Sequence, residues 1–173
     1  MPPKRFTFNL IFIIALIFIF LVSAITTLYT DYLWFQALNF SQIFLISLKT
    51  KVLIFIIAAM VFFIFTAVNL WITKTKNPIK LKLAIISIIS IIIGFTYSSQ
   101  WFVFLQYLNQ IPFNLTDPIL FKDVSFYVFS LPFFLAVWSF AMTIITITLI
   151  LTAIDYFSTY LINSFKQPAV ATV

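Results

Sequence analysis

The sequence contains no cysteine, no histidine and no glutamate, and its only glycine is Gly94. Without cysteine there is no disulfide framework and no thiol chemistry. Without histidine the chain also lacks the commonest general base, and the two absences together remove the usual zinc ligands. We therefore expect a protein that is not an enzyme, with no catalytic residue, no bound metal and no cofactor.

Charged residues are also scarce. They make up 8% of the chain, whereas 64% of its 173 residues are hydrophobic. Soluble domains are about 45–50% apolar and about 25% charged. A chain of this length could not hide so much apolar surface in one core, so its main partner must be the lipid bilayer. The net charge of +6 does not indicate a nucleic-acid partner, because the basic residues flank apolar runs instead of forming one patch.

Four apolar runs approach or exceed the length of about 20 residues that a membrane-spanning helix needs. They predict an all-α polytopic protein, a single transmembrane module with spans at about residues 6–28, 52–72, 83–98 and 132–154. Ser130 lies where a cap of the fourth span belongs, and Pro132 falls in its first turn. The first run could instead be a signal peptide cleaved after "VSA" at Ala24, but it exceeds the usual apolar core of about 7–15 residues.

The distribution of basic residues predicts the orientation. Seven of the ten fall on the side of the two termini and of the loop at residues 73–82, and three fall on the other side. We therefore expect a multi-pass protein of the cell membrane with both termini in the cytoplasm. The seven are Lys4, Arg5, Lys74, Lys76, Lys80, Lys82 and Lys166, and the three are Lys49, Lys51 and Lys122.

The two outer loops each predict a short helix at the membrane interface. Residues 32–48 are apolar but broken by polar positions, and "QWFVFLQYLNQ" places Gln106, Asn109 and Gln110 on one helical face. Each span also carries small or hydroxyl residues at helical spacing, such as Ser87, Ser90 and Gly94 in the third. These stripes indicate helix packing, with a hydroxyl-lined transport path as the alternative.

Ionisable residues are missing from the centres of the predicted spans, where proton- and ion-coupled transporters usually place one. The nearest is Asp155, which follows the fourth span. Its alternative role is to pair with a cation in an aqueous vestibule.

The segment from Asn109 to Pro132 interrupts the apolar pattern. Pro112 ends the amphipathic helix, and "NLTDP" is typical of a turn in which Asp117 bonds nearby backbone and Pro118 disfavours helix. Its many aromatic residues favour an ordered interfacial turn over a mobile linker. Asp117, Lys122 and Asp123 could alternatively bind a partner.

Two blocks of sequence carry a resemblance. They resemble the amino-terminal part of a family of large multi-pass membrane proteins of unknown function, uncharacterised protein family 0182. The first block matches at Asp31, Leu33, Trp34 and Phe35. The second matches at Leu108, Asn109, Pro112, Phe113, Asp117, Pro118, Phe121, Asp123, Phe126, Tyr127, Phe129, Leu131, Pro132 and Phe133.

The resemblance implies a multi-pass topology but no established activity, so it identifies no catalytic residue. The family usually has glycine where this sequence has Asn114, and both residues tolerate a left-handed backbone. Family members are several times longer, with further spans and a large extracytoplasmic region. The chain therefore resembles only the amino-terminal module, as a truncated gene product or a fragment.

Two functions remain open on the sequence. The first is a non-enzymatic membrane anchoring and assembly module, whose partners are other membrane helices or an extracytoplasmic domain missing from this chain. The second is a part of a transporter or channel. The candidate docking motif comprises Asp31, Trp34, Asn109, Pro112, Asp117, Pro118, Lys122 and Asp123.

Overall fold

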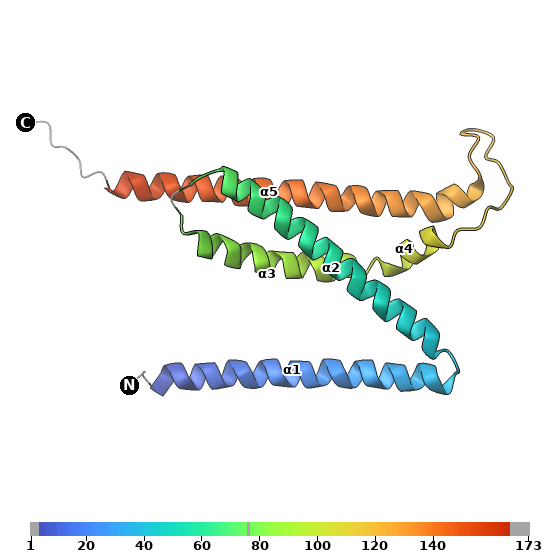
Figure 1. Ribbon diagram of the computed structural model, residues 1–173, viewed down its shortest axis with the longest axis horizontal. Helices are drawn as coiled ribbons and strands as arrows, with labels where there is room; N and C mark the ends of the chain where they lie inside the picture. The colour runs from blue at the N-terminus through green and yellow to red at the C-terminus, as the bar shows by residue number, and fades with distance from the viewer. Residues whose placement is uncertain (1–3, 76, 167–173) are drawn as a thin grey trace, which may run out of the picture. The chain divides into compact units, whose positions relative to one another are not determined.

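The computed structural model describes residues 4–75 and 77–166, and these residues form helices with no named strand. The helices are α1 (Lys4–Ala37), α2 (Ser41–Ile72), α3 (Ile79–Ser98), α4 (Trp101–Leu108) and α5 (Leu131–Lys166), and a π-helical segment, η1 (Phe126–Ser130), leads into α5 (Figure 1). Four helices are long and apolar enough to cross a membrane. The expected all-α class with four such helices is confirmed.

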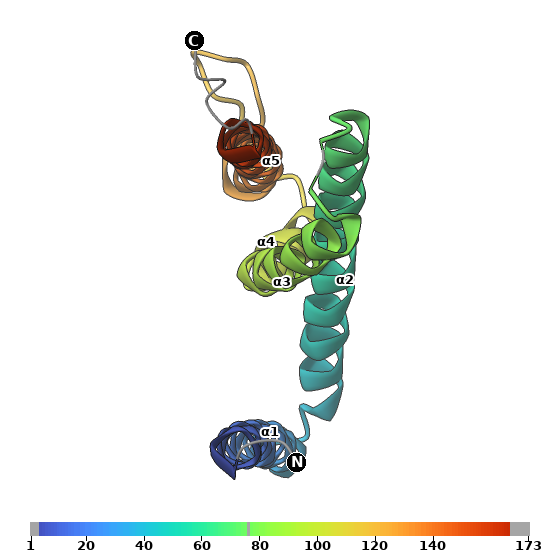
Figure 2. The same cartoon turned by 90° about the vertical axis from the view of Figure 1, so that its left-hand side faces the viewer.

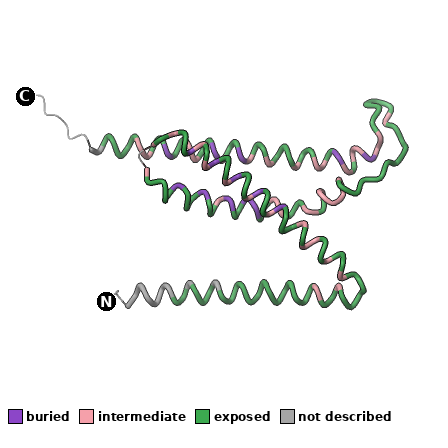
Figure 3. The backbone as a smooth tube through the Cα atoms, viewed as in Figure 1, coloured by how far each residue is buried: buried purple, intermediate pink, exposed green. Residues whose placement is uncertain are grey.

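The chain divides into two compact units, residues 1–48 and 49–173. The first unit contains α1 and the start of α2. A short turn at residues 38–40 joins them, with Asn39 in the left-handed region at φ 61°. Where the structure describes the side chains of α1, from Ile11 to Ala37, nearly all of them are exposed, which is what a lipid-facing helix requires (Figure 3).

The predicted interfacial helix in the first outer loop is not a separate element. Apart from the turn at residues 38–40, its residues 32–48 belong to the end of α1 and the start of α2, which are continuous with the spans. The rings of Tyr32 and Phe35 pack against Phe44 with centroids 5.9 and 5.6 Å away. These ring contacts hold the end of α1 against the start of α2. The polar residues Gln36, Ser41, Gln42 and Ser47, which suggest a loop in the sequence, are therefore part of the two helices.

The second unit is built from α2, α3 and α5, with α4 at one end. In Figure 2, α3 and α5 are seen end-on and α2 passes beside both. Buried residues recur about once per turn along α2 from Ile54 and along α3, whereas the side chains described in α5 are buried only at Ile144, Thr148 and Asp155 (Figure 3). Phe62 and Ile86 are the largest fully buried apolar side chains. Because lipid tails are as apolar as these side chains, close packing and polar contacts must hold the helices together.

Gly94 marks a close approach of α3 to α2. A Cβ atom built there would lie 2.8 Å from Phe55 Cδ2 and 3.0 Å from the Phe55 carbonyl oxygen. Ser90 is buried one turn away and donates to the Ile86 carbonyl oxygen at 2.7 Å, whereas Ser87 is exposed and donates to Leu83 of its own helix. Gly94 and Ser90 of the predicted stripe therefore face the interior of the second unit, and Ser87 does not.

The fourth long helix begins earlier than the sequence suggests. Helical backbone starts at Val124, and Asp123 occupies the capping position, since its carboxylate accepts the Ser125 N–H at 2.8 Å. The prediction that Ser130 caps this helix is therefore wrong. The ring of Pro132 removes one backbone donor inside the helix, and Leu131 N–H bonds the Phe126 carbonyl five residues back. That missing donor accounts for the π segment.

Candidate functional site

The first candidate site is a hairpin between α4 and η1, which we call the Asp117 turn (residues 109–125). Thr116 and Asp123 form an isolated antiparallel bridge, and Val124 N–H donates to the Leu115 carbonyl oxygen at 2.8 Å. At the tip, Phe121 N–H donates to the Asp117 carbonyl oxygen at 3.0 Å. The segment is therefore closed by backbone bonds at its base and at its tip.

The Asp117 carboxylate holds the tip in place. It accepts the Ile119 N–H at 3.2 Å, the Leu120 N–H at 3.1 Å and the Tyr127 hydroxyl at 2.7 Å. Pro118 occupies the first position of this short turn, where its fixed φ is favourable and its missing N–H costs nothing. The Tyr127 hydroxyl, followed by the two backbone donors, holds the pKa of the Asp117 carboxyl below its ordinary value.

The Asp123 carboxylate holds the base of the turn. It accepts N–H bonds from Phe113 at 3.2 Å, Asn114 at 2.8 Å and Ser125 at 2.8 Å. The Ser125 side chain is the largest cause of a lowered pKa at Asp123, and the backbone donors add to it. Asn114 has φ 57°, so it does adopt the left-handed backbone expected where the family has glycine.

These hydrogen bonds limit what the two acids can do. Both carboxylates are directed at N–H and O–H donors, so neither is arranged to bind a cation. No group of three acidic ligands suited to a metal occurs within residues 4–75 and 77–166. The two carboxylates therefore fix the backbone of the turn.

The other residues of the predicted docking motif lie around this framework or elsewhere. Asn109 donates to the Leu105 carbonyl oxygen at 2.9 Å and ends α4, and Pro112 and Pro118 are exposed. Lys122 is exposed, with its amine 5.9 Å from the Phe126 ring. Asp31 and Trp34 lie exposed on α1 in the first unit, and the Trp34 ring meets Phe35 at 5.2 Å.

Sequence reasoning did not find two partners of the turn. Tyr127 was expected to contact the interface, yet its hydroxyl reaches Asp117 ten residues away. Ser130 donates to the Gln110 side chain at 2.8 Å and so ties α5 to the end of α4. The ring of Tyr107 on α4 also stacks on Phe133 of α5, with centroids 4.0 Å apart. Only the fold brings these pairs together.

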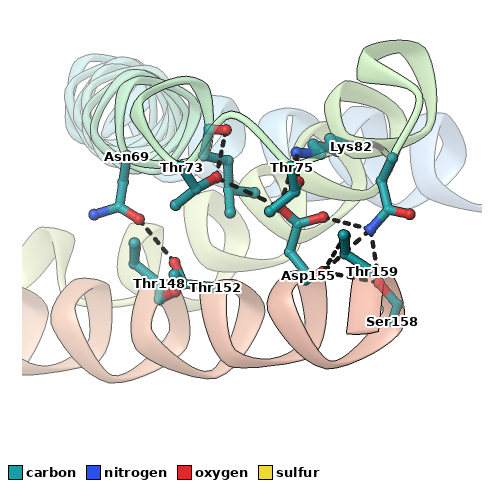
Figure 4. A network of polar contacts seen from close by, with 11 residues as sticks. Asn69, Thr73, Thr75, Lys82, Thr148, Thr152, Asp155, Ser158 and Thr159 are labelled. Carbon is teal, nitrogen blue, oxygen red and sulfur yellow. Dashed lines mark hydrogen bonds and ion pairs between the residues drawn. The ribbon is translucent and has the colours of Figure 1, made fainter. Parts of the chain in front are cut away.

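The second candidate site is a buried polar cluster at the opposite end of α5 (Figure 4). Lys82 Nζ lies 2.8 Å from Asp155 Oδ2, and both side chains are only 8% exposed. The same carboxylate accepts bonds from Thr75 at 2.5 Å and from Asn77 at 2.7 Å. We call this group the Lys82–Asp155 cluster; it comprises Thr73, Thr75, Asn77, Lys82, Asp155, Ser158 and Thr159.

The cluster involves two residues that the sequence analysis places outside the membrane spans. Lys82 lies in the first turn of α3 and not in the loop, and Asp155 lies within α5, which continues to Lys166. The helices that can span a membrane thus do contain ionisable residues, near one end. Asp155 does pair with a cation, the ammonium group of Lys82, but the two side chains are only 8% exposed, so the pair does not have the aqueous surroundings of the vestibule alternative.

Hydrogen bonds continue from this cluster along the interface of α2 and α5. Thr152 donates to the Asn69 side chain at 2.7 Å, and the hydroxyls of Thr66 and Thr148 lie 2.9 Å apart although both residues are buried. Among the described residues, no buried side-chain nitrogen or oxygen lacks a hydrogen-bond partner. In a lipid environment such satisfied polar pairs stabilise helix association.

A cavity of about 240 Å³ lies beside the cluster. Lys82, Asp155, Asn77 and Ser158 line its polar part, and the remaining lining residues are aliphatic. The sequence does carry a signal for the cluster, the polar spacing of Thr66 and Asn69 on α2 and Thr73 directly after it. Its counterpart Thr148, Thr152, Asp155 was not recognised, because the fourth span was predicted to end at residue 154.

Comparison with known proteins places the chain in a family. Residues 8–172 match the model of the uncharacterised protein family UPF0182. A UPF0182 protein of Desulforamulus reducens is 28% identical over 90% of this chain, and one of Methanospirillum hungatei is 31% identical over 85%. These matches cover 21% and 17% of the two relatives, so the chain spans about a fifth of their length. No solved structure matches.

Proposed function

This chain belongs to the uncharacterised protein family UPF0182, and on that premise we propose that it is a non-enzymatic membrane anchoring and assembly module. Four helices anchor it in the cell membrane with both termini in the cytoplasm. At the opposite side of the membrane, the Asp117 turn is presented to other protein segments. The observation that carries the proposal is the ordered turn at the start of α5, held by two carboxylates.

The hydrogen bonding of the hydroxyl groups supports anchoring over transport. Most hydroxyls in the long helices donate to a carbonyl oxygen three or four residues earlier in their own helix, as Thr27, Ser87 and Thr96 do. Others are used between helices, as in the pair of Thr66 and Thr148. Hydroxyls engaged in this way stabilise packing and leave few groups to line a polar passage.

A topology experiment tests the proposal. Reporter fusions at Asn39, Asn77, Asn114 and Ser164 are expected to alternate between outside and cytoplasm, beginning outside, and the protein should stay in the membrane fraction after carbonate extraction. A cytoplasmic reporter at Asn114 would contradict the proposed presentation of the turn. Release of the protein by carbonate would contradict anchoring itself.

A part in a transporter or channel is the second candidate function. The observation in its favour is the cavity beside Lys82 and Asp155, because buried ionisable residues in membrane helices often mark a substrate or ion path. Purified protein in liposomes should show no flux of protons, potassium or chloride above that of empty liposomes if anchoring is correct. Flux that disappears in Asp155→Asn, with the fold intact, would favour the transport role.

A further inference from the structure

The cavity beside the Lys82–Asp155 cluster changes from polar to apolar along the helix axes. The two helices that form most of its wall, α3 and α5, run in opposite directions, as their contacts at both ends require. On α3 the lining residues are Lys82 and then Ile85, and on α5, read against the chain direction, they are Ser158 and then Leu151. The polar residues therefore lie together at the end where α3 begins, and the aliphatic residues follow toward the middle of the helices.

This order of polarity is also that of a lipid molecule in a bilayer. The 20 residues of α3 span about 30 Å, which matches the hydrocarbon thickness, so Lys82 in its first turn lies near the boundary between acyl chains and headgroups. Leu81, Ile85 and Ile154 line the cavity and are exposed, so the cavity opens toward the surrounding lipid. Leu70 of α2 is buried and closes its inner side. A phospholipid beside these helices thus has its headgroup level with the polar residues and its acyl chains level with the aliphatic ones.

The volume of the cavity suits part of one acyl chain. An apolar cavity of about 150 Å³ accommodates benzene, so the 240 Å³ found here accommodates roughly ten carbon atoms. Water is a poor occupant, because six of the ten lining residues are aliphatic and apolar cavities stay dry. An acyl chain can enter from the surrounding lipid without losing any hydrogen bond.

The charges at this end of the helices favour an anionic headgroup. Residues 73–82 contain four lysines and no acidic residue. Asp155 lines the cavity, but its charge is neutralised by Lys82 at 2.8 Å. Lys74 and Lys80 are exposed and add positive charge that Asp155 does not balance. Lysines at the surface of a membrane attract anionic lipids.

Lys82 also keeps one donor for such a headgroup. Its ammonium group has three N–H donors, and two of them bond Thr75 at 2.5 Å and Asp155 at 2.8 Å. The third has no acceptor among the described residues, although the side chain is only 8% exposed and lines the cavity. An oxygen atom of a lipid phosphate or ester in the cavity would satisfy it.

We propose that this cavity binds one anionic phospholipid, with an acyl chain between α3 and α5 and the phosphate at the end that holds Lys82. The proposal deepens the proposed anchoring function by naming a lipid class. It rests on that function, because α3 and α5 must lie in a membrane for a lipid to enter between them. A neutral lipid and a free anion are the competing occupants.

Native mass spectrometry of the 173-residue chain tests the site. The protein is purified from membranes, freed of lipid and offered equal amounts of phosphatidylglycerol and phosphatidylcholine with the same acyl chains. One phosphatidylglycerol per chain should be retained over phosphatidylcholine by about five-fold or more, the effect of one lysine near a membrane surface. Ile85→Trp, which fills the cavity from its rim, should abolish this retention. Ile88→Trp is the matched control, because Ile88 is 62% exposed on the same helix and does not line the cavity.

Other results overturn the proposal. Equal retention of the two lipids would refute the anionic headgroup, and equal retention by the Ile85→Trp and Ile88→Trp variants would refute the cavity as the site. If circular dichroism shows that Ile85→Trp does not fold, Ile154→Trp on the opposite wall, where Ile154 is 58% exposed, repeats the test. Displacement of the lipid by excess inorganic phosphate would indicate a site for a free anion instead.

Carbonate extraction of the same proteins reports anchoring separately. A chain that stays in the membrane fraction but retains no phosphatidylglycerol would refute the lipid site alone. Release of the chain by carbonate would contradict the proposed anchoring function itself.

Discussion

Removing either partner of the Lys82–Asp155 ion pair should destabilise the second unit far more than removing both. Asp155→Asn keeps the shape of the side chain but leaves the Lys82 ammonium buried without a counter-charge. Lys82→Met leaves the carboxylate with the neutral donors Thr75 and Asn77 and a long contact of 3.5 Å from Thr73. Both side chains are 8% exposed, so water can replace the lost partner only in part.

The expected magnitudes follow from this burial. Breaking one side of a buried ion pair costs about 3–5 kcal/mol. The Lys82→Met cost should be near the lower limit, because Asp155 keeps two hydrogen bonds worth about 1 kcal/mol each. In the double variant no charge is buried, and the free energy of unfolding should lie within about 1–2 kcal/mol of the original protein. The coupling between the two sites should therefore reach the upper part of the usual range of about 0.5–3 kcal/mol.

Unfolding in mixed micelles, followed by circular dichroism during titration with sodium dodecyl sulfate, measures the four free energies of this cycle. Lys80→Met is the matched control, since Lys80 is exposed two residues before Lys82 and should change stability by less than about 0.5 kcal/mol. If the double variant loses the sum of the two single losses, the pair is not coupled and our reading of the cluster is wrong.

Three further predictions concern α3 and the Asp117 turn. Gly94→Leu should destabilise the helix pair by about 1–3 kcal/mol in the same titration, because its Cβ alone would meet Phe55, whereas Ser87→Leu on the exposed face should be nearly neutral. Phe121→Gly should stabilise the turn by about 1 kcal/mol, seen as slower amide exchange of residues 119–124, and faster exchange would contradict the strain at φ 54°. The lowered pKa values of Asp117 and Asp123 predict a turn that is stable above about pH 4 and loosens as the pH falls below the ordinary value of 3.8. Amide hydrogen exchange, corrected for the intrinsic pH dependence of the exchange rate, measures this loosening. In Asp117→Asn the increase in exchange at low pH should be smaller.

The sequence predicts the number of long helices because each is marked by an apolar run, and nothing further is needed to recognise it. It does not predict where the helices end. The predicted fourth span stops at residue 154 because a lone aspartate is costly in lipid, yet α5 continues past Asp155. The charge of Asp155 is tolerated there because Lys82, which lies 73 residues away in the sequence, neutralises it. No local sequence pattern predicts a contact between residues so far apart.

More of the Asp117 turn can be predicted from the sequence, because several of its hydrogen bonds join residues that are close together in the sequence. The bonds from Asp117 to Ile119 and Leu120 are those expected of an aspartate before proline. The bonds from Asp123 to Phe113 and Asn114 were not foreseen, since they depend on how the hairpin closes. The hydrogen bonds within the tip of the turn are therefore predictable from the sequence, and the hydrogen bonds that join the two strands of the hairpin are not.

The polar contacts also explain how the turn keeps a fixed place on the second unit. Lys82 and Asp155 join α3 to α5 at one end, and Tyr97 and Thr143 join them again nearer the other. Two such points prevent α5 from sliding along α3, because a shift of one residue would separate both pairs by about 1.5 Å. The bonds from Ser130 to Gln110 and from Tyr127 to Asp117 then connect the start of that helix to the turn. A change in the ion pair, far from the Asp117 turn, should thus alter the position of the turn along the axis that α3 and α5 share.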